Sequence, residues 1–126
     1  MESMDNKAIV RDFYETAFNQ HDPESAVQKH MGATYRQHNP MVPDGKDAFV
    51  SFVSGFVKQF PGLHSDIKRV LSEGDLVVLH SNMKINQEDR GSAVVDIFRV
   101  EGGKIVEHWD VVQEIPEKSA NQNTMF

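Results

Sequence analysis

The sequence predicts an α+β fold in which helices cover one face of a curved antiparallel sheet. Apolar residues recur at helical spacing up to Phe60, and from about residue 65 they follow the alternating period of strands. Short turns that contain Gly separate the later segments, as in a series of hairpins. Helices first and an antiparallel meander after them define this architecture.

Two helices are expected near the N-terminus. The first spans residues 5 to 19, and Asp5 or Asn6 can serve as its N-cap. The second is short: it begins at Pro23, because proline suits the first position of a helix, and it ends at Gly32. Together they form a helical pair.

A third helix is expected from about Lys46 to Phe60, where Pro61-Gly62 breaks it. A short extended segment, residues 34 to 39, precedes this helix and is stopped by Pro40. The apolar face of the helix carries four phenylalanines, Phe49, Phe52, Phe56 and Phe60. These side chains are first of all candidates for the core.

Four strands are expected after residue 64. The first ends at the turn Glu73-Gly74-Asp75. The others are residues 76–85, 92–100 and 104–115. The last two are joined by Glu101-Gly102-Gly103, so they form a hairpin.

Length and composition indicate one domain, residues 1–126, with a polar C-terminal tail at 117–126. Hydrophobic residues at 39% and charged residues at 25% are typical of a globular protein. The net charge of −6 argues against a nucleic-acid partner, because phosphate binding needs clustered Lys and Arg. No apolar run is long enough to span a membrane, and no signal peptide is evident, so we expect a cytoplasmic protein.

Neither a metal nor a cofactor is expected; a His/Asp metal site assembled only in the folded chain is the alternative. The chain has no cysteine, which excludes disulfides, thiolate catalysis and cysteine-ligated metals. The six histidines show no i, i+4 pair of the kind found in helical zinc sites. Glycine-rich phosphate loops and the Gly-x-Ser-x-Gly motif are also absent.

The last hairpin carries the strongest functional signal. Asp96, His108 and Asp110 lie among apolar neighbours, where charged groups are costly unless they have partners. A carboxylate beside a histidine can bring the pair toward neutral pH, as general acid/base catalysis requires. Asp110, if desolvated, could remove a proton next to a carbonyl. A structural ion pair is the alternative interpretation.

The register of this hairpin depends on its turn. A three-residue loop would pair Val100 with Lys104 and place Asp96 opposite His108, with Asp110 opposite Val94 on the same face. A two-residue loop at Gly102-Gly103 would pair Asp96 with Trp109 instead. His108 and Asp110 would then lie on the other face of the sheet.

The opposite face of the hairpin is also apolar, which a sheet exposed to water on one side does not need. It carries Ile97, Ile105, Trp109 and Val111 in the first register. We therefore expect a homodimer through this face, with Trp109 as the central contact.

Several motifs in succession resemble the SnoaL-like polyketide cyclases. They are Tyr35-Arg36-Gln37-His38-Asn39-Pro40, Glu73-Gly74-Asp75-Leu76-Val77-Val78-Leu79-His80-Ser81, Val95-Asp96-Ile97-Phe98-Arg99-Val100 and Gly103-Lys104-Ile105-Val106-Glu107-His108-Trp109-Asp110-Val111. The ending, Pro116 followed by Asn121 to Phe126, is similar to that of a short bacterial subgroup. The resemblance implies the cone-shaped α+β barrel of the nuclear transport factor 2-like superfamily, with about three helices closing a curved sheet around a pocket.

The resemblance also implies a chemistry. SnoaL-like cyclases close a ring by intramolecular aldol condensation without a cofactor, and an aspartate serves as acid/base. The resemblance places that role at Asp110, with Asp96 and His108 nearby, and the sequence leaves open whether Asp110 or Asp96 removes the proton. The expected substrate-binding residues are His38, His80, Tyr14, Phe56 and Phe98. The phenylalanines of the third helix favour a small carbonyl compound over a four-ring polyketide.

Two other functions fit the same residues. The protein could bind a small ligand without catalysis, because this superfamily includes isomerases, dehydratases, epoxide hydrolases and proteins that only bind ligands. Tyr35 to Pro40 would then be a loop held by its own hydrogen bonds, and His80 a satisfied core histidine. A third possibility is a dimerisation module with the apolar face of the sheet as its only site.

Overall fold

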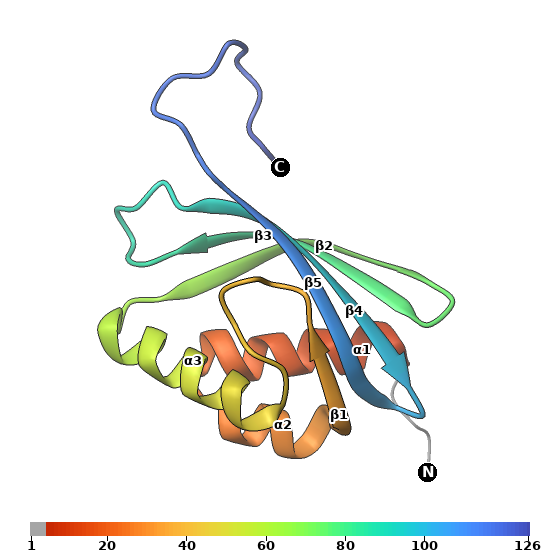
Figure 1. Ribbon diagram of the computed structural model, residues 1–126. Helices are drawn as coiled ribbons and strands as arrows, with labels where there is room; N and C mark the ends of the chain where they lie inside the picture. The colour runs from red at the N-terminus through yellow and green to blue at the C-terminus, as the bar shows by residue number, and fades with distance from the viewer. Residues whose placement is uncertain (1–4) are drawn as a thin grey trace.

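Three helical segments pack against a curved five-stranded sheet in the computed structural model, which describes residues 5–126 (Figure 1). The helices are α1 (Asn6–Tyr14), which continues as the π-helix η1 (Glu15–Asn19), α2 (Pro23–His30) and α3 (Lys46–Gln59). The strands are β1 (Met31–Gln37), β2 (His64–Glu73), β3 (Leu76–Lys84), β4 (Ser92–Glu101) and β5 (Lys104–Glu114). The predicted α+β class is confirmed.

The first helix begins and ends with side-chain contacts to the backbone. Asp5 caps it by accepting a hydrogen bond of 2.8 Å from the Ala8 amide. At the other end the Asn19 side chain binds the backbone of β2: its amide donates to the Ser65 carbonyl and its carbonyl accepts from the Ser65 amide. This pair of bonds fastens the π-helical turn to an edge strand of the sheet.

The strands follow the order β1-β5-β4-β3-β2, and every neighbouring pair is antiparallel except β1 and β5. The expected extended segment at 34–39 therefore begins earlier, at Met31, and becomes an edge strand. The expectation that Gly32 ends the second helix is wrong, since α2 ends at His30. Gly32 lies in β1, where a β-carbon would come within 2.9 Å of Val106.

The β4–β5 turn has two residues, not three. Gly102 and Gly103 have φ angles of 58° and 79°, as a tight hairpin turn requires, and Glu101 pairs with Lys104. The expected pairing of Val100 with Lys104 is therefore wrong. The pairing of Asp96 with Trp109, expected for a two-residue loop, is also wrong, because the register of the strands shifts just after the turn.

A β-bulge at Val106 changes the register of the hairpin. Val100 pairs with Ile105, whereas the next pair is Arg99 with Glu107, so one residue of β5 is left without a partner. As a result, Asp96 lies opposite Asp110, and His108 lies opposite Phe98. The predicted direct pairing of Asp96 with His108 is wrong, but the bulge keeps Asp96, His108 and Asp110 on one face.

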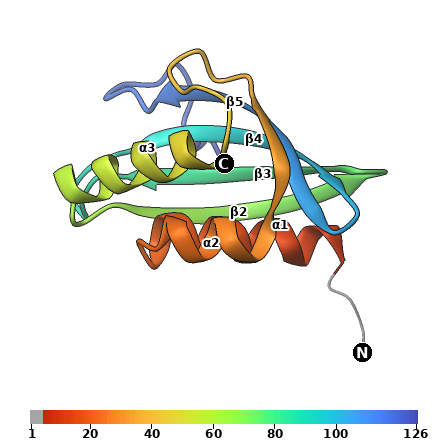
Figure 2. The ribbon, with the colours of Figure 1, turned by 60° about the horizontal axis from the view of Figure 1, so that its bottom comes forward.

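The helices cover that face, and the core lies between them and the sheet (Figure 2). Phe13 of α1 is fully buried, with its ring centroid 5.1 Å from that of Phe49 and 5.8 Å from that of Phe98. Ile105 is also fully buried, so its expected place on the outer face is wrong. The bulge accounts for this, because it reverses the side-chain direction between Ile105 and Trp109.

After β5 the chain forms an arc without helix or strand that projects beyond the sheet (Figure 1). The arc returns, so that the ring of Phe126 lies 5.2 Å from that of His80. Among residues 5–126, no helix has the length and hydropathy needed to cross a membrane.

Candidate functional site

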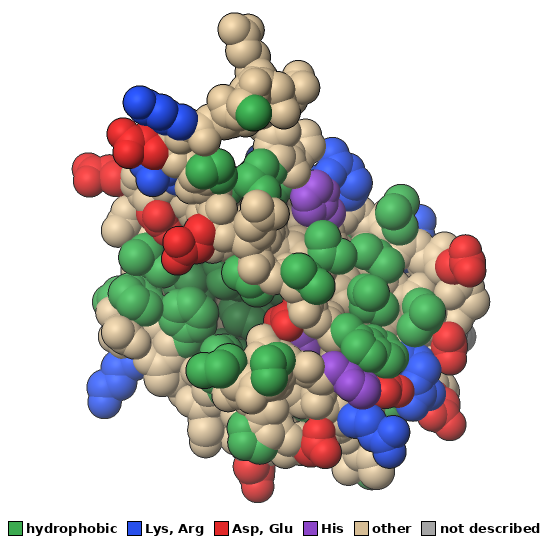
Figure 3. All heavy atoms as spheres, turned by 45° about the horizontal axis from the view of Figure 1, so that its top comes forward, with side chains coloured by type: hydrophobic (Ala, Val, Ile, Leu, Met, Phe, Trp, Pro, Cys, Tyr) green, Lys and Arg blue, Asp and Glu red, His purple; other side chains and the backbone are tan. Residues whose placement is uncertain are grey.

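A cavity of about 210 Å³ lies between α3 and the inner face of the sheet. Figure 3 shows this side of the molecule as a hollow edged by hydrophobic side chains, with acidic and histidine side chains at its border. Aromatic residues form much of the wall: Tyr14, Phe18, Phe49, Phe52, Phe56 and Phe98. Drug-sized pockets usually measure about 300–1,000 Å³, so this cavity suits a small ligand.

Asp96 and His108 form a buried pair in this cavity. Asp96 is 4% exposed, and its Oδ1 lies 2.7 Å from His108 Nε2. The second carboxyl oxygen, Oδ2, is buried without a hydrogen-bond partner. An unpartnered carboxyl oxygen is unfavourable in a protein interior, so a hydrogen-bond donor or a proton at this atom would stabilise it.

Gln37, at the end of β1, fixes the protonation of the histidine. Its Oε1 accepts a hydrogen bond from the Asn39 backbone amide, and its amide group donates to the Tyr35 hydroxyl. The same Oε1 lies 2.7 Å from His108 Nδ1, so that nitrogen must carry a proton and donate. A neutral His108 then has its lone pair on Nε2, facing Asp96.

The pair therefore shares one further proton. If His108 is neutral, Asp96 must be protonated in order to donate to Nε2; if Asp96 is ionised, His108 must be an imidazolium. In both states the pair has no net charge. Either state avoids an isolated charge in the protein interior.

Asp110 belongs to the same site but has different partners. Both of its carboxylate oxygens accept from the Asn39 side-chain amide, at 3.0 and 3.1 Å. The other end of that amide accepts from the Met41 backbone, which sets its orientation. Asp110 Oδ2 is 4.0 Å from His108 Nε2. Asp110 thus raises the negative charge of the site, with its own oxygens satisfied.

Burial raises the pKa of the Asp96 carboxyl above its ordinary value; the hydrogen bond and charge of His108 oppose this rise, and the Asp110 carboxylate adds to it. A carboxyl group with a raised pKa is a stronger base once it has lost its proton. Burial and then the nearby Asp96 also raise the pKa of Tyr14 well above its ordinary value. Tyr14 therefore keeps its hydroxyl proton, and its oxygen lies 2.9 Å from Ser65 Oγ.

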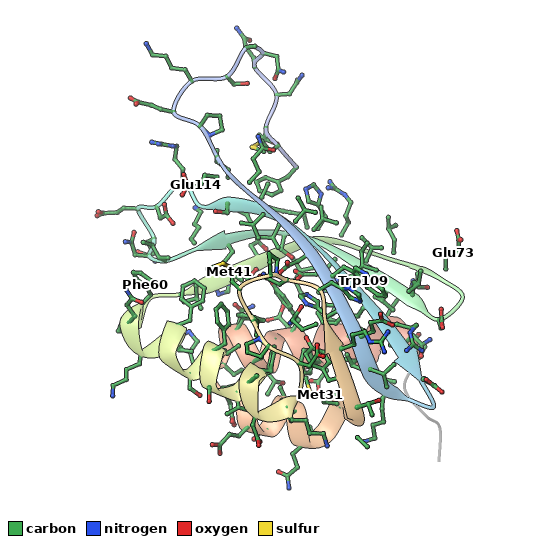
Figure 4. The ribbon with its side chains drawn as sticks, in the orientation of Figure 1. Met31, Met41, Phe60, Glu73, Trp109 and Glu114 are labelled. Carbon is green, nitrogen blue, oxygen red and sulfur yellow. The ribbon has the colours of Figure 1, made fainter. Side chains whose placement is uncertain are left out.

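Tyr14, Phe56 and Phe98 line the cavity together with the three predicted acid/base residues. His38 and His80 do not. His38 binds Glu107 at 2.7 Å and stacks on Trp109, whose position on β5 is labelled in Figure 4. His80 contacts Arg69 and Phe126. Both histidines lie on the outer side of the sheet, away from the cavity.

Gln37 and Asn39 are functional candidates that residue-by-residue reasoning missed. Both belong to the polar segment from Tyr35 to Pro40, which the sequence marks as unusual. A signal for their role was therefore present. Their partners on β5 are 71 residues away in the sequence, however, and only the parallel pairing of β1 with β5 brings them together.

Asp96, His108 and Asp110 also offer ligand atoms within 4.8 Å of one another, close enough to hold a metal ion. The short contact between His108 Nε2 and Asp96 Oδ1 is a hydrogen bond, however. A cation at this place would have to displace the proton between these two atoms.

Fold and site together define a class of protein: an α+β cone with a buried Asp–His pair and a second aspartate among the residues that line an aromatic cavity. The sequence model of the SnoaL-like domain family matches residues 10–108, most of the chain. The protein therefore belongs to the SnoaL-like domain family. No protein with a curated function matches the sequence.

Many solved structures have the same fold, and three illustrate it. TsrD from Streptomyces laurentii is 21% identical with a TM-score of 0.68, covering 87% of this chain and 91% of its own. A candidate polyketide cyclase from Acidithiobacillus ferrooxidans is 15% identical with a TM-score of 0.70, covering 89% and 91%. A candidate ketosteroid isomerase from Kribbella flavida is 17% identical with a TM-score of 0.70, covering 92% and 83%. These similarities show the fold.

Proposed function

We propose that this protein is a cofactor-independent enzyme that removes a proton from the carbon next to a carbonyl group, with Asp96 as the base. The observation that carries the proposal is the buried, unpartnered Oδ2 of Asp96, a residue that lines the cavity. Asp110 is less suited to the role, since Asn39 occupies both of its oxygens. The names of two similar structures, a candidate cyclase and a candidate isomerase, belong to the same carbonyl chemistry.

The proton moves from the substrate carbon to Asp96 Oδ2, and the electron pair of the broken C–H bond moves into the carbonyl to form an enolate. At this stage His108 is an imidazolium and donates to Asp96 Oδ1. Tyr14 lines the cavity, and its hydroxyl, which contacts Ser65 Oγ in this structure, donates a hydrogen bond to the enolate oxygen. One well-placed donor of this kind stabilises an enolate by about 3 kcal/mol.

The second half of the reaction returns the proton from Asp96 to the substrate. Return to a different carbon gives an isomerase, whereas attack of the enolate carbon on a second carbonyl gives an aldol product. In both cases the Asp96–His108 pair ends in its starting state, so no external proton donor or cofactor is needed. Gln37 holds His108 in place through both halves.

Hydrogen–deuterium exchange tests the proposal before the natural substrate is known. A panel of cyclic ketones and 1,3-diketones is incubated with the protein in deuterated buffer, and exchange next to the carbonyl is followed by NMR. We expect saturable exchange above the buffer rate, unchanged by a metal chelator. Binding without exchange across the panel would contradict catalysis and identify a non-catalytic ligand-binding protein.

Gln37→Leu is expected to slow the exchange by about tenfold or more, because an imidazole whose orienting partner is lost can adopt the wrong tautomer. The proton of neutral His108 would move from Nδ1 to Nε2. Nitrogen-15 NMR of the histidine ring reports this change directly. Gln37→Glu keeps an acceptor at this place and is expected to keep the Nδ1 proton. An unchanged ring spectrum in Gln37→Leu would contradict the role of Gln37.

A homodimer through the outer face of the sheet is part of the same proposal. Val111 is 71% exposed there, beside Val95, Ile97 and Trp109. Val111→Lys is expected to convert the dimer to a monomer in sedimentation velocity experiments, because a charge would be buried in an apolar contact. Ser51→Lys, on the helical side, is the matched control. A wild-type protein that sediments as a monomer would contradict this part of the proposal.

A further inference from the structure

The charges around the cavity are unbalanced. Three carboxyl groups line it, those of Asp89, Asp96 and Asp110. Neither Lys nor Arg is among the described residues that line it. Figure 3 shows acidic side chains both at the rim of the hollow and inside it.

One histidine is the cationic partner of these carboxyl groups among the described residues that line the cavity. Asp96 is balanced by His108, so this pair has no net charge. Asp110 binds a neutral amide, and its Oδ2 lies 4.0 Å from the same histidine nitrogen. Hydrogen bonds from the backbone of Ile85 and Gly91, and the charges of Lys84 and Arg90 outside the cavity lining, lower the pKa of Asp89. Within the lining, three carboxyl groups therefore share one cationic group.

The aromatic wall adds to this effect. The faces of phenylalanine rings carry partial negative charge and attract cations. Phe18, Phe52 and Phe56 line the same cavity as the carboxylates. A cationic group would meet favourable partners here, and an anionic group would meet none except His108, whose charge Asp96 already uses.

We propose that the cavity selects its ligand by charge: it binds small ring ketones that carry a protonated amine more tightly than uncharged ones, and it rejects carboxylated ones. This inference rests on the proposed function for the carbonyl group of the ligand. The order of binding follows from the excess of carboxyl groups over cationic groups in the cavity lining. Anionic groups such as carboxylates and phosphates on a substrate would have to lie outside the cavity.

Three derivatives of 1-tetralone provide matched probes. They carry an aminomethyl, a hydroxymethyl or a carboxylate group at position 6, and so have nearly equal size and charges of +1, 0 and −1. Binding is measured by NMR titration of the side-chain amide signals of Gln37 and Asn39, which lie in the cavity and report binding at this place. The same samples in deuterated buffer report exchange next to the carbonyl.

The amine is expected to bind at least roughly tenfold more tightly than the carboxylate, with the alcohol between them. High salt should reduce this ratio, because it screens the partly exposed carboxylates. The double variant Asp89→Asn/Asp110→Asn should remove most of it. Asp66→Asn, which deletes an exposed carboxylate of β2 outside the cavity, should leave it unchanged.

Equal binding of the three probes, tighter binding of the carboxylate, or no binding of any probe at millimolar concentration would overturn the proposal. The salt dependence of the wild-type protein decides the case if the double variant does not fold. The expected order of binding without exchange would leave charge selection standing and contradict catalysis. Exchange with all three probes at equal affinity would support catalysis and contradict charge selection.

Discussion

Asp96→Asn is expected to reduce the rate of exchange next to the carbonyl by about 10²- to 10⁴-fold, the usual contribution of a general base. The amide has nearly the size of the carboxyl group and can donate to His108 Nε2, so the hydrogen bond at 2.7 Å has a replacement. It cannot accept a proton at Oδ2. NMR exchange rates of the wild-type and variant proteins, at the same ketone concentration, measure the loss.

The same variant is expected to unfold at a higher denaturant concentration than the wild type at neutral pH. The pKa of Asp96 is raised on folding, so its contribution to stability is fully present below the unfolded value of 3.8 and is lost as the pH rises through the folded value. The advantage of Asp96→Asn should therefore be small near pH 4 and grow toward pH 7. Urea unfolding at both pH values measures it.

Asp110→Asn is the matched control for catalysis. It removes a carboxylate from the same cavity, but one whose two oxygens already accept from Asn39. We expect a smaller loss of exchange than in Asp96→Asn. If Asp110→Asn lost more activity than Asp96→Asn, Asp110 would be the base and the roles of the two residues would be reversed.

Phe13→Ala is expected to lower the free energy of unfolding by about 3–5 kcal/mol, enough to unfold much of the protein if its total stability is at the low end of the usual range. Phe13 is fully buried and joins α1 to α3 and to the sheet through the rings of Phe49 and Phe98. Its removal leaves a cavity that the surrounding helices and strands can fill only in part. Urea unfolding monitored by circular dichroism measures the change.

Phe52→Ala is the control for this variant. Phe52 lies on α3 and is 42% exposed, so its truncation should cost about 1 kcal/mol or less. Equal losses of unfolding free energy in Phe13→Ala and Phe52→Ala would contradict the central place of Phe13 in the core. A binding defect in Phe52→Ala without a stability defect would agree with its place in the cavity wall.

Local patterns in the sequence predict most of the secondary structure. Pro23 begins α2, Asp5 caps α1 and Pro61-Gly62 follows the end of α3, as their chemistry indicates. Each of these signals acts within a few residues of the chain. The π-helical turn from Glu15 to Asn19 has no such local signal. Its end is held by hydrogen bonds between the Asn19 side chain and the backbone of Ser65, which lies far away in the sequence.

The site was only partly predictable, since it depends on contacts between distant segments. Asp96, His108 and Asp110 stand out as charged groups among apolar residues of a hairpin. His80 could not be placed from its pattern, because Val77, Val78 and Leu79 are all apolar and give no alternation that assigns a face. The structure shows Val77 and Leu79 buried, which directs His80 outward.

The β-bulge at Val106 has a consequence for how this hairpin can change. The two-residue turn and the extra residue of β5 have opposite effects on side-chain direction. Together they put Asp96 and Asp110 on the cavity side, whereas the two-residue turn alone would place them on opposite faces. An insertion or deletion of a single residue between Arg99 and Glu107 would turn one strand inside out relative to the other. Changes of length in this segment are therefore compatible with the site only in pairs.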